Sequence, residues 1–424
     1  MKKIILVVAI LALSGHLFSQ VISQWRGPQR NGLYPDTALL TSWPEAGPER
    51  IWSVKGVGKG HSSAAVTDEA IFITGMKDST DYLFKLSHQG DILWDVPVGR
   101  SWNSSYPDTR TTPTIEGDRI YTISGAGTVT CVDAQEGKLI WSVDGANTFN
   151  AAWGVWGISE SPLLIDDKVI YTPAGTQTTM VALDKLTGET IWATESILDT
   201  SGYVSPLLIE RGGKKIIVTF LANHLIGVDA SNGEILWKHD YYETDSDACK
   251  EVWINSPKIN INTPLYKDGR FYITSGYNHV GAMFSLSEDG SEIELLWTDH
   301  TLDTHHGGVV LVDGYIYGSN WINNRSGNWC CIDWDTGKTM YEAEWKTKGS
   351  IIYADGKLYC YDEKDGNLAL VKADPSAFDL LSSFRISEGT GPHWSHPVID
   401  NGILYVRHGG VLMAFDIQQA SSGN

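Results

Sequence analysis

The sequence predicts an all-β fold: an eight-bladed β-propeller of four-stranded antiparallel blades, closed by a strand from the N-terminal region. Three observations predict it. The 424 residues include 43 glycines and 17 tryptophans, a composition rich in turns and in large flat side chains. One hairpin motif recurs along the chain at intervals of about 40 to 60 residues. A second hairpin precedes each copy, and two hairpins together make the four short strands of a propeller blade.

The first 19 residues are typical of a secretory signal peptide. Lys2 and Lys3 form a short positive region, residues 4–13 are an apolar run, and we expect cleavage after Ser19. The apolar run is too short to span a bilayer. We therefore predict an exported protein, soluble in the periplasm or secreted. Residues 20–424 are expected to form one domain without a transmembrane segment.

The recurring hairpin has a fixed spacing. An apolar strand ends in Asp, Gly follows four residues later, and an aromatic residue stands four residues beyond Gly. Asp bonds backbone amides two residues on and Gly accepts positive φ, so together they close a hairpin. We expect the aromatic side chain, on the outgoing strand, to pack against a neighbouring repeat. The four best copies are Asp133/Gly137/Trp141, Asp184/Gly188/Trp192, Asp229/Gly233/Trp237 and Asp333/Gly337/Tyr341.

Eight repeats follow one another without a linker. The preceding hairpins are 112–124, 161–173, 205–220, 263–275, 308–320, 349–361 and 395–407. The repeats begin near His61, Thr111, Ser159, Tyr203, Asn262, His306, Gly349 and His393. The outer strand of the seventh is predicted at 380–387, and the eighth ends one strand short at 412–418. Segment 48–56 has the pattern of the missing strand, and its pairing would remove an exposed sheet edge.

The repeat resembles that of the pyrroloquinoline-quinone (PQQ) type propeller family. Residues 182–192, ALDKLTGETIW, follow the family pattern A-x-D-x-x-T-G-x-x-x-W. Residues 24–52 resemble the opening of secreted bacterial members that are often labelled polyvinyl alcohol dehydrogenase-like. The resemblance implies one of two functions. Some members are quinoprotein alcohol dehydrogenases that hold PQQ and Ca²⁺ over the central channel. Others bind no cofactor, such as the propeller lipoprotein of the outer-membrane protein assembly machinery.

The dehydrogenase alternative has weak support in the residues. These enzymes use an adjacent cysteine pair, and Cys330 and Cys331 resemble it, but they fall inside a predicted strand, where neighbouring side chains point to opposite faces. Glu160, Asn255 and Asp303 have the chemistry of calcium ligands or a base, yet no stretch matches the enzymes residue by residue. We assign no cofactor. PQQ with Ca²⁺ stays open, and so does the question of whether the chain is an enzyme.

A ligand site is predicted at the mouth of the channel. The loops that enter the inner strands carry Trp, Tyr, His, Asn and Arg outside the aromatic position of the repeat. Aromatic rings with amides and a few charges suit a flat organic ring or a sugar face, although the same residues could simply fill the channel. The predicted site comprises His61, Trp102, Arg110, Trp153, Trp156, Glu160, Tyr203, Asn255, Asn262, His305, His306, His393 and Trp394.

Two further inferences limit the function. His305 and His306, with His61 or His393, could supply imidazoles to a metal, but spacing alone does not bring the rings together, so no metal ligand is assigned. The formal net charge of −19 disfavours nucleic acid as a partner, because phosphate binding needs concentrated positive charge. The sequence favours an exported protein that binds a small molecule, a carbohydrate or an envelope protein at the channel mouth. The alternatives are a PQQ- and Ca²⁺-dependent alcohol dehydrogenase and a cell-envelope assembly scaffold.

Overall fold

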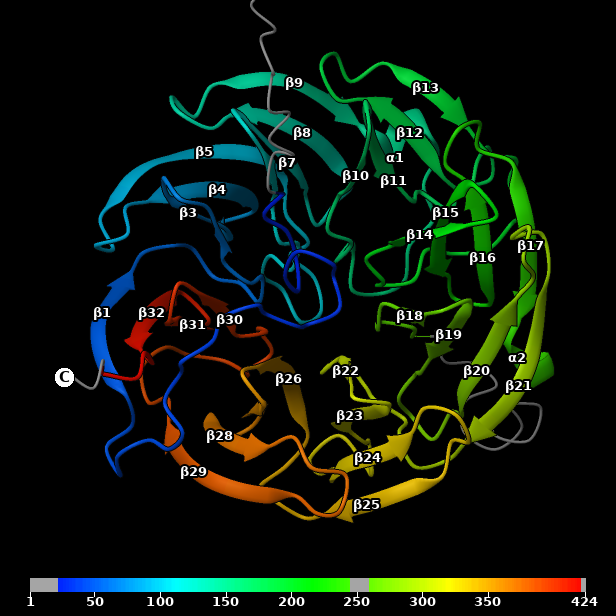
Figure 1. Cartoon of the computed structure of the whole chain (residues 1–424). Coiled ribbons are helices and arrows are strands. Elements are labelled where there is room, and N and C mark those ends of the chain that lie inside the picture. Colours follow the sequence, from blue (N-terminus) through cyan, green and yellow to red (C-terminus); the bar gives the residue numbers. More distant parts are fainter. Residues whose placement is uncertain (1–21, 245–258, 421–424) are drawn as a thin grey trace, which may run out of the picture.

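The computed structural model describes residues 22–244 and 259–420. The predicted signal peptide, Cys249 and the predicted site residue Asn255 lie outside these residues. Eight four-stranded antiparallel sheets stand in a ring around a central axis (Figure 1), which confirms the predicted fold. In the described part of the chain, no helix has the length and apolar character needed to cross a membrane.

Each of the first four blades is built from consecutive strands. Blade one has β2 (Ala65–Val66), β3 (Ile71–Lys77), β4 (Thr80–Leu86) and β5 (Ile92–Arg100), and blade two has β6 (Thr114–Glu116), β7 (Arg119–Ile123), β8 (Thr128–Asp133) and β9 (Leu139–Asp144). Blade three has β10 (Leu163–Ile165), β11 (Lys168–Tyr171), β12 (Val181–Asp184) and β13 (Thr190–Ala193). Blade four has β14 (Leu207–Arg211), β15 (Lys214–Phe220), β16 (His224–Asp229) and β17 (Ile235–Asp240). The short helices α1 (Gly145–Thr148) and α2 (Tyr241–Thr244) follow blades two and four.

The second half of the ring repeats this order. Blade five has β18 (Leu265–Lys267), β19 (Arg270–Ile273), β20 (Gly281–Leu286) and β21 (Ile293–Asp299). Blade six has β22 (Val309–Val312), β23 (Tyr315–Ser319), β24 (Trp329–Asp333) and β25 (Thr339–Ala343), and blade seven has β26 (Gly349–Ala354), β27 (Lys357–Asp362), β28 (Asn367–Lys372) and β29 (Asp379–Arg385). Blade eight has β30 (Val398–Asp400), β31 (Ile403–His408) and β32 (Val411–Asp416).

The N-terminal region closes the ring, as the sequence predicts. Strand β1 (Glu49–Lys55) pairs antiparallel with β32, from Glu49 opposite Asp416 to Lys55 opposite Val411. Figure 1 shows the blue β1 beside the red β32 at the outer edge of blade eight. This pairing supplies the fourth strand of the last blade and joins the two ends of the described chain in one sheet.

Neighbouring blades are joined by the aromatic and glycine residues of the repeat. The Trp141 indole on β9 donates its N–H to the carbonyl of Lys185, 3.0 Å away in the β12–β13 turn. Gly188 of the same turn lies under the indole, where an added Cβ would stand 2.8 Å from a ring carbon. Trp94 and Trp192 dock in the same way on the turns that contain Gly137 and Gly233. The predicted contact between repeats is therefore confirmed.

Each outer strand also has a β-bulge that the sequence analysis did not anticipate. In all eight blades the register of the outermost pair shifts by one residue just before the aromatic position of the repeat. The extra residues are Ile51, Leu93, Ile140, Ile191, Leu236, Leu296, Met340 and Leu381. A bulge bends an edge strand and makes it a poor template for pairing with another chain.

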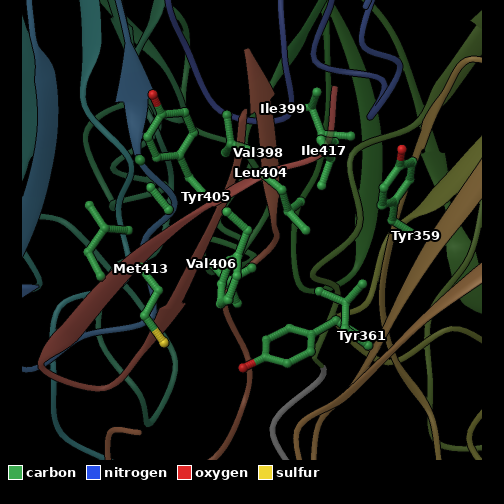
Figure 2. Close-up of a cluster of buried hydrophobic side chains, with 14 of the residues drawn as sticks. Tyr359, Tyr361, Val398, Ile399, Leu404, Tyr405, Val406, Met413 and Ile417 are labelled. Carbon is green, nitrogen blue, oxygen red and sulfur yellow. The ribbon is translucent and has the colours of Figure 1, made fainter. Parts of the chain in front are cut away.

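The core lies between the faces of adjacent blades. Figure 2 shows one such cluster, in which Tyr359 and Tyr361 of β27 approach Leu404 and Val406 of β31. All four residues are almost fully buried. Because every blade packs on two neighbours, the loops at the ends of the blades are held in fixed positions around the axis.

Candidate functional site

The two ends of the propeller differ in their loops. In each blade the chain runs from the inner to the outer strand, so the first and third turns of a blade lie at one end. The middle turn and the connection to the next blade lie at the opposite end, which we call the loop face. The long connections 101–113, 145–162 and 194–206 all belong to the loop face.

A cavity of about 310 Å³ lies at the centre of the loop face, and we call it the chamber. Six aromatic residues from different loops line it: Trp25, Tyr106, Trp156, Tyr203, Tyr277 and Trp394. Trp394 is central to this group, with ring centroids 5.9 Å from Tyr106, 5.3 Å from His306 and 5.0 Å from His61. The Arg110 guanidinium lines the chamber as well and donates to the Trp156 carbonyl at 2.8 Å.

Residues 22–34 form a segment that we call the strap. It bridges blade two, where Ser23 pairs with Ile115, and blade seven, where Leu33 pairs with Tyr353. Figure 1 shows this dark blue stretch running through the middle of the ring. Trp25 of the strap contributes its ring to the chamber. The strap therefore crosses the central channel beneath the mouth.

Two buried arginines hold the strap against the inner strands. Arg26 donates to the carbonyl of Val309 at 2.6 Å and lies 3.3 Å from Nδ1 of His396. Arg30 donates to the carbonyls of Ser161 and Pro162 in blade three and of Pro206 in blade four. Burial lowers the pKa of Arg26 to about 10 and that of Arg30 to about 9, so both remain charged at neutral pH. Each guanidinium satisfies several backbone carbonyls at once.

Glu160 lies near the buried Arg30 rather than in the chamber. Its carboxyl oxygens contact the backbone N–H and the hydroxyl of Thr172, both at 3.1 Å. Burial raises the pKa of Glu160 to about 8, although the bonds from Thr172 and the charge of Arg30 oppose the shift. A group in this environment is predominantly protonated at neutral pH.

His305, His306 and Glu363 line one side of the chamber, and together with Lys348, which pairs with Glu363, we call them the histidine wall. Nε2 of His306 lies 2.8 Å from one oxygen of Glu363, and Nζ of Lys348 lies 2.7 Å from the other. The Lys348 side chain is 2% exposed and also donates to the carbonyl of Asn323. Burial raises the pKa of Glu363, but His306 and Lys348 outweigh this effect and lower it to about 2. Glu363 is therefore ionised.

Buried polar residues fix the loop that carries the two histidines. Asn262 donates to the carbonyls of Thr304 and His305 and accepts from the N–H of Gly308 at 3.1 Å. Asp303 accepts from the backbone N–H of Asn278 at 3.0 Å and of Trp321 at 2.9 Å. These bonds tie the histidine loop to turns of blades five and six, so the wall is held by the surrounding scaffold.

The structure brings together about half of the predicted site residues. Those that line the chamber are His61, Arg110, Trp156, Tyr203, His305, His306 and Trp394. Trp102, Trp153, Glu160, Asn262 and His393 do not line it. Trp153 packs in the core between blades two and three, and His393 is buried with its ring stacked on that of His408, 3.6 Å away. Asn255 lies outside the described residues.

The predicted site did not include nine chamber residues. They are Trp25, Tyr106, Ser159, Ser205, Ile261, Tyr277, Asn324, Glu363 and His396. Tyr277, Asn324 and Glu363 belong to the middle turns of their blades, whereas the prediction considered the connections between blades. In a propeller both sets of loops meet at the same end, so the topology alone could have included these turns. Trp25 lies in a segment that matches no repeat, and its place in the channel had no sequence signal.

The chamber does not suit the calcium and quinone of the dehydrogenases. Calcium takes six to eight oxygen ligands. Among the described residues that line the chamber, Glu363 is the one carboxylate, and Lys348 already pairs with it. Cys330 and Cys331 are buried free thiols within β24. The guanidinium groups of Arg26, Arg30 and Arg110 all donate to backbone carbonyls, and Arg110 is the one of these three that lines the chamber.

Comparisons with known proteins agree with this fold. Residues 45–347 match the family described as outer membrane protein assembly factor BamB. A protein of that name from Kangiella koreensis is 28% identical over 236 residues, which are 54% of this chain and 52% of the relative. The chain thus spans about half the length of this curated relative.

Solved structures show the same architecture at low sequence identity. BamB from Moraxella catarrhalis has a TM-score of 0.62 at 14% identity, covering 88% of this chain and 99% of its own. The quinohemoprotein alcohol dehydrogenase ADHIIG from Pseudomonas putida HK5 has a TM-score of 0.63 at 12% identity, covering 93% and 80%. At this level of identity the two structural similarities establish the fold alone, whereas the family match also establishes the family. The chain belongs to the family of PQQ-like propellers described as outer membrane protein assembly factor BamB.

Proposed function

We propose that this protein acts in the cell envelope as an assembly scaffold that binds a protein partner with its loop face. Its family and its relative from Kangiella koreensis are both described as outer membrane protein assembly factors, which supports this class of function. The predicted signal peptide and the acidic charge agree with an exported protein that does not bind nucleic acid. The scaffold was an alternative on sequence grounds, and it becomes the main proposal here.

The observation that carries the proposal is the exposed apolar surface around the chamber. Tyr106 is 61% exposed, Leu198 77%, Ile322 48% and Val155 47%, and all four belong to loops of the loop face. The other exposed large apolar residues of the described chain lie on the outer strands, apart from Leu186 in a turn of the opposite end. Apolar side chains held out to solvent around a concave site are typical of protein interaction surfaces.

Site-specific photo-crosslinking in the native host tests this proposal. A photoreactive phenylalanine analogue would replace Leu198, Ile322 or, as a control at the opposite end, Leu186. We expect positions 198 and 322 to crosslink to the same envelope protein, whereas position 186 does not. A strain that lacks the protein should also contain less folded outer-membrane protein. Equal crosslinking from all three positions, or an unchanged outer-membrane protein content, would argue against a scaffold.

A second candidate function is the binding of a small molecule or a sugar, which the chamber itself favours. Its volume of about 310 Å³ and its six aromatic residues match the lower size range and the lining of small-ligand pockets. Titration with simple sugars can be followed by tryptophan fluorescence, and PQQ with Ca²⁺ serves as the negative control. We expect saturable quenching that Trp394→Ala removes and that Trp345→Phe, outside the chamber, retains. A fluorescence signal that no compound changes would leave the scaffold as the single proposal.

A further inference from the structure

We propose that the histidine wall binds one divalent transition-metal ion of the zinc class through His305, His306 and Glu363. This site goes beyond the scaffold function and does not depend on it. Three features of the wall indicate it: the position of the donor atoms, the state of the histidine ring nitrogens and the contacts that orient each ligand.

The donor atoms are already close enough to share an ion. One ligand atom from each of His305, His306 and Glu363 lies within 4.8 Å of the other two. Zinc bonds of about 2.0 to 2.2 Å in tetrahedral geometry place donor atoms about 3.3 Å apart. The distance of 2.8 Å from His306 Nε2 to Glu363 Oε2 is slightly below this value. Rotations of these side chains that bring the three donor atoms to about 3.3 Å from one another would complete the site.

Two buried ring nitrogens of the histidine wall lack hydrogen-bond partners. Within the described part of the chain, Nδ1 of His305 and Nδ1 of His306 are buried and accept or donate no hydrogen bond. Nε2 of His306 lies 2.8 Å from Glu363 Oε2, so this nitrogen and the carboxylate already face each other. Buried polar atoms without a partner are rare, and each requires an explanation. A metal ion would give Nδ1 of His305 a partner and would be shared by Nε2 of His306 and Glu363, because each imidazole binds a metal through the lone pair of one ring nitrogen.

Outer contacts hold each ligand in a suitable orientation. Nε2 of His305 lies 3.0 Å from the Tyr277 hydroxyl. When Nε2–H donates to this oxygen, Nδ1 keeps its lone pair for a metal, as is usual for metal-bound histidines. Lys348 holds one oxygen of Glu363 and leaves the other directed to His306. Asn262 fixes the His305 carbonyl, so the backbone between the two histidines is restrained as well.

The donor set selects the class of metal. Two imidazoles and one carboxylate suit Zn²⁺, Co²⁺, Ni²⁺ or Cu²⁺, whereas Ca²⁺ and Mg²⁺ require mostly oxygen ligands. Three protein ligands leave at least one coordination position, which would face the chamber. The aromatic residues around the chamber would then surround whatever group of a partner or ligand completes the coordination. Lys348 shares the charge of Glu363, so we expect weaker binding than at an all-anionic site.

Metal titration of the untagged, chelator-treated mature protein tests the site. Calorimetry with Zn²⁺ and absorption spectra with Co²⁺ should give one ion per chain. His306→Ala and Glu363→Gln should each lower the affinity at least about 100-fold, and Tyr277→Phe about 10-fold, as expected for an outer contact. His88→Ala, in a turn at the opposite end, should retain full affinity.

The variants also separate the possible failures. Circular dichroism shows whether His306→Ala folds, and Glu363→Gln decides the question if it does not. No binding of either metal at micromolar concentration, or unchanged binding in both ligand variants, would refute the site. Crosslinking through the loop face can succeed when metal binding fails, so the scaffold proposal and the metal-site proposal can be refuted independently.

Discussion

Glu160 shows how much a single buried side chain can depend on its surroundings. Its folded pKa of about 8 lies above the ordinary value of 4.5, because burial penalises the carboxylate. The folded state therefore holds a proton that the unfolded state has released at intermediate pH. The stabilising contribution is complete below about pH 4.5 and is lost as the pH rises through about 8. While the two states differ by one proton, stability falls by about 1.4 kcal/mol per pH unit.

Glu160→Gln tests this directly. Glutamine can accept from the Thr172 N–H and donate to its hydroxyl, so it imitates the protonated acid without ionising. We expect the midpoint of thermal unfolding to fall between pH 5 and 8.5 in the wild type and to fall less in this variant. Glu189→Gln, at an exposed position, serves as the control and should follow the wild type. Parallel curves for all three proteins would place the ionisation of Glu160 outside this range.

Also at the residue scale, the sequence identified the types of residue at the mouth better than their positions. His61, Trp156 and Trp394 were found because they interrupt the repeat with aromatic rings in connecting loops. Glu160 was assigned to the site because it lies in a connecting loop and has the chemistry of a calcium ligand or a base, but its side chain turns toward Thr172 and Arg30. The direction of a side chain in a loop depends on contacts from distant blades, and these leave no periodic signal in the sequence.

At the scale of the element, the β12–β13 turn requires two properties of one glycine: a positive φ and no side chain beneath the Trp141 ring. Gly188 has φ +76°, and an added Cβ would stand 2.8 Å from the Trp141 ring. Gly213 has almost the same φ, +75°, but an added Cβ there would meet nothing within 4 Å. We expect Gly213→Ala to cost about 1 kcal/mol from the backbone alone. Gly188→Ala should cost about 1 to 3 kcal/mol more, because the turn must move away from the indole. Denaturant unfolding of both variants measures the difference, and equal costs would show that the turn tolerates the side chain.

The same turn explains why the fold could be predicted from the sequence. Asp, Gly and Trp recur because each copy needs a closed turn, a positive φ and an indole over the next blade. Because three structural requirements act at three fixed positions, they produce a recurring sequence pattern that can be recognised. The bulge residues Ile51 and Leu93, by contrast, were not predicted, because a bulge needs only one extra residue and its aliphatic side chain is not distinctive.

At the scale of the whole molecule, the strap fastens the inner strands across the channel. Arg30 donates to carbonyls of two blades that are consecutive in the chain, while the strap also pairs with blades two and seven. Arg30→Ala should leave these buried carbonyls without a donor and cost about 2 to 4 kcal/mol. Arg270→Ala, which removes a surface ion pair with Asp335, should cost less than about 1 kcal/mol. Urea unfolding compares the two, and a small effect at position 30 would show that water replaces the guanidinium.

Closure by β1 determines whether the ring unfolds as a unit. The described blades are joined in sequence, and β1 with β32 is the sheet contact that links the first and last of them. Glu49 and Asp416 are exposed partners at one end of this pair, so cysteines at both positions can form a disulfide without disturbing the core.

We expect the oxidised Glu49→Cys/Asp416→Cys variant to gain about 2 to 4 kcal/mol, because the bond restrains a very long loop in the unfolded chain. The gain should disappear with reductant, and Glu49→Cys alone should show none. The long loop makes this test informative, since the entropic effect of a crosslink grows with the length of chain that it closes. If oxidation leaves the unfolding midpoint unchanged, the ring must come apart at another blade junction while β1 stays paired.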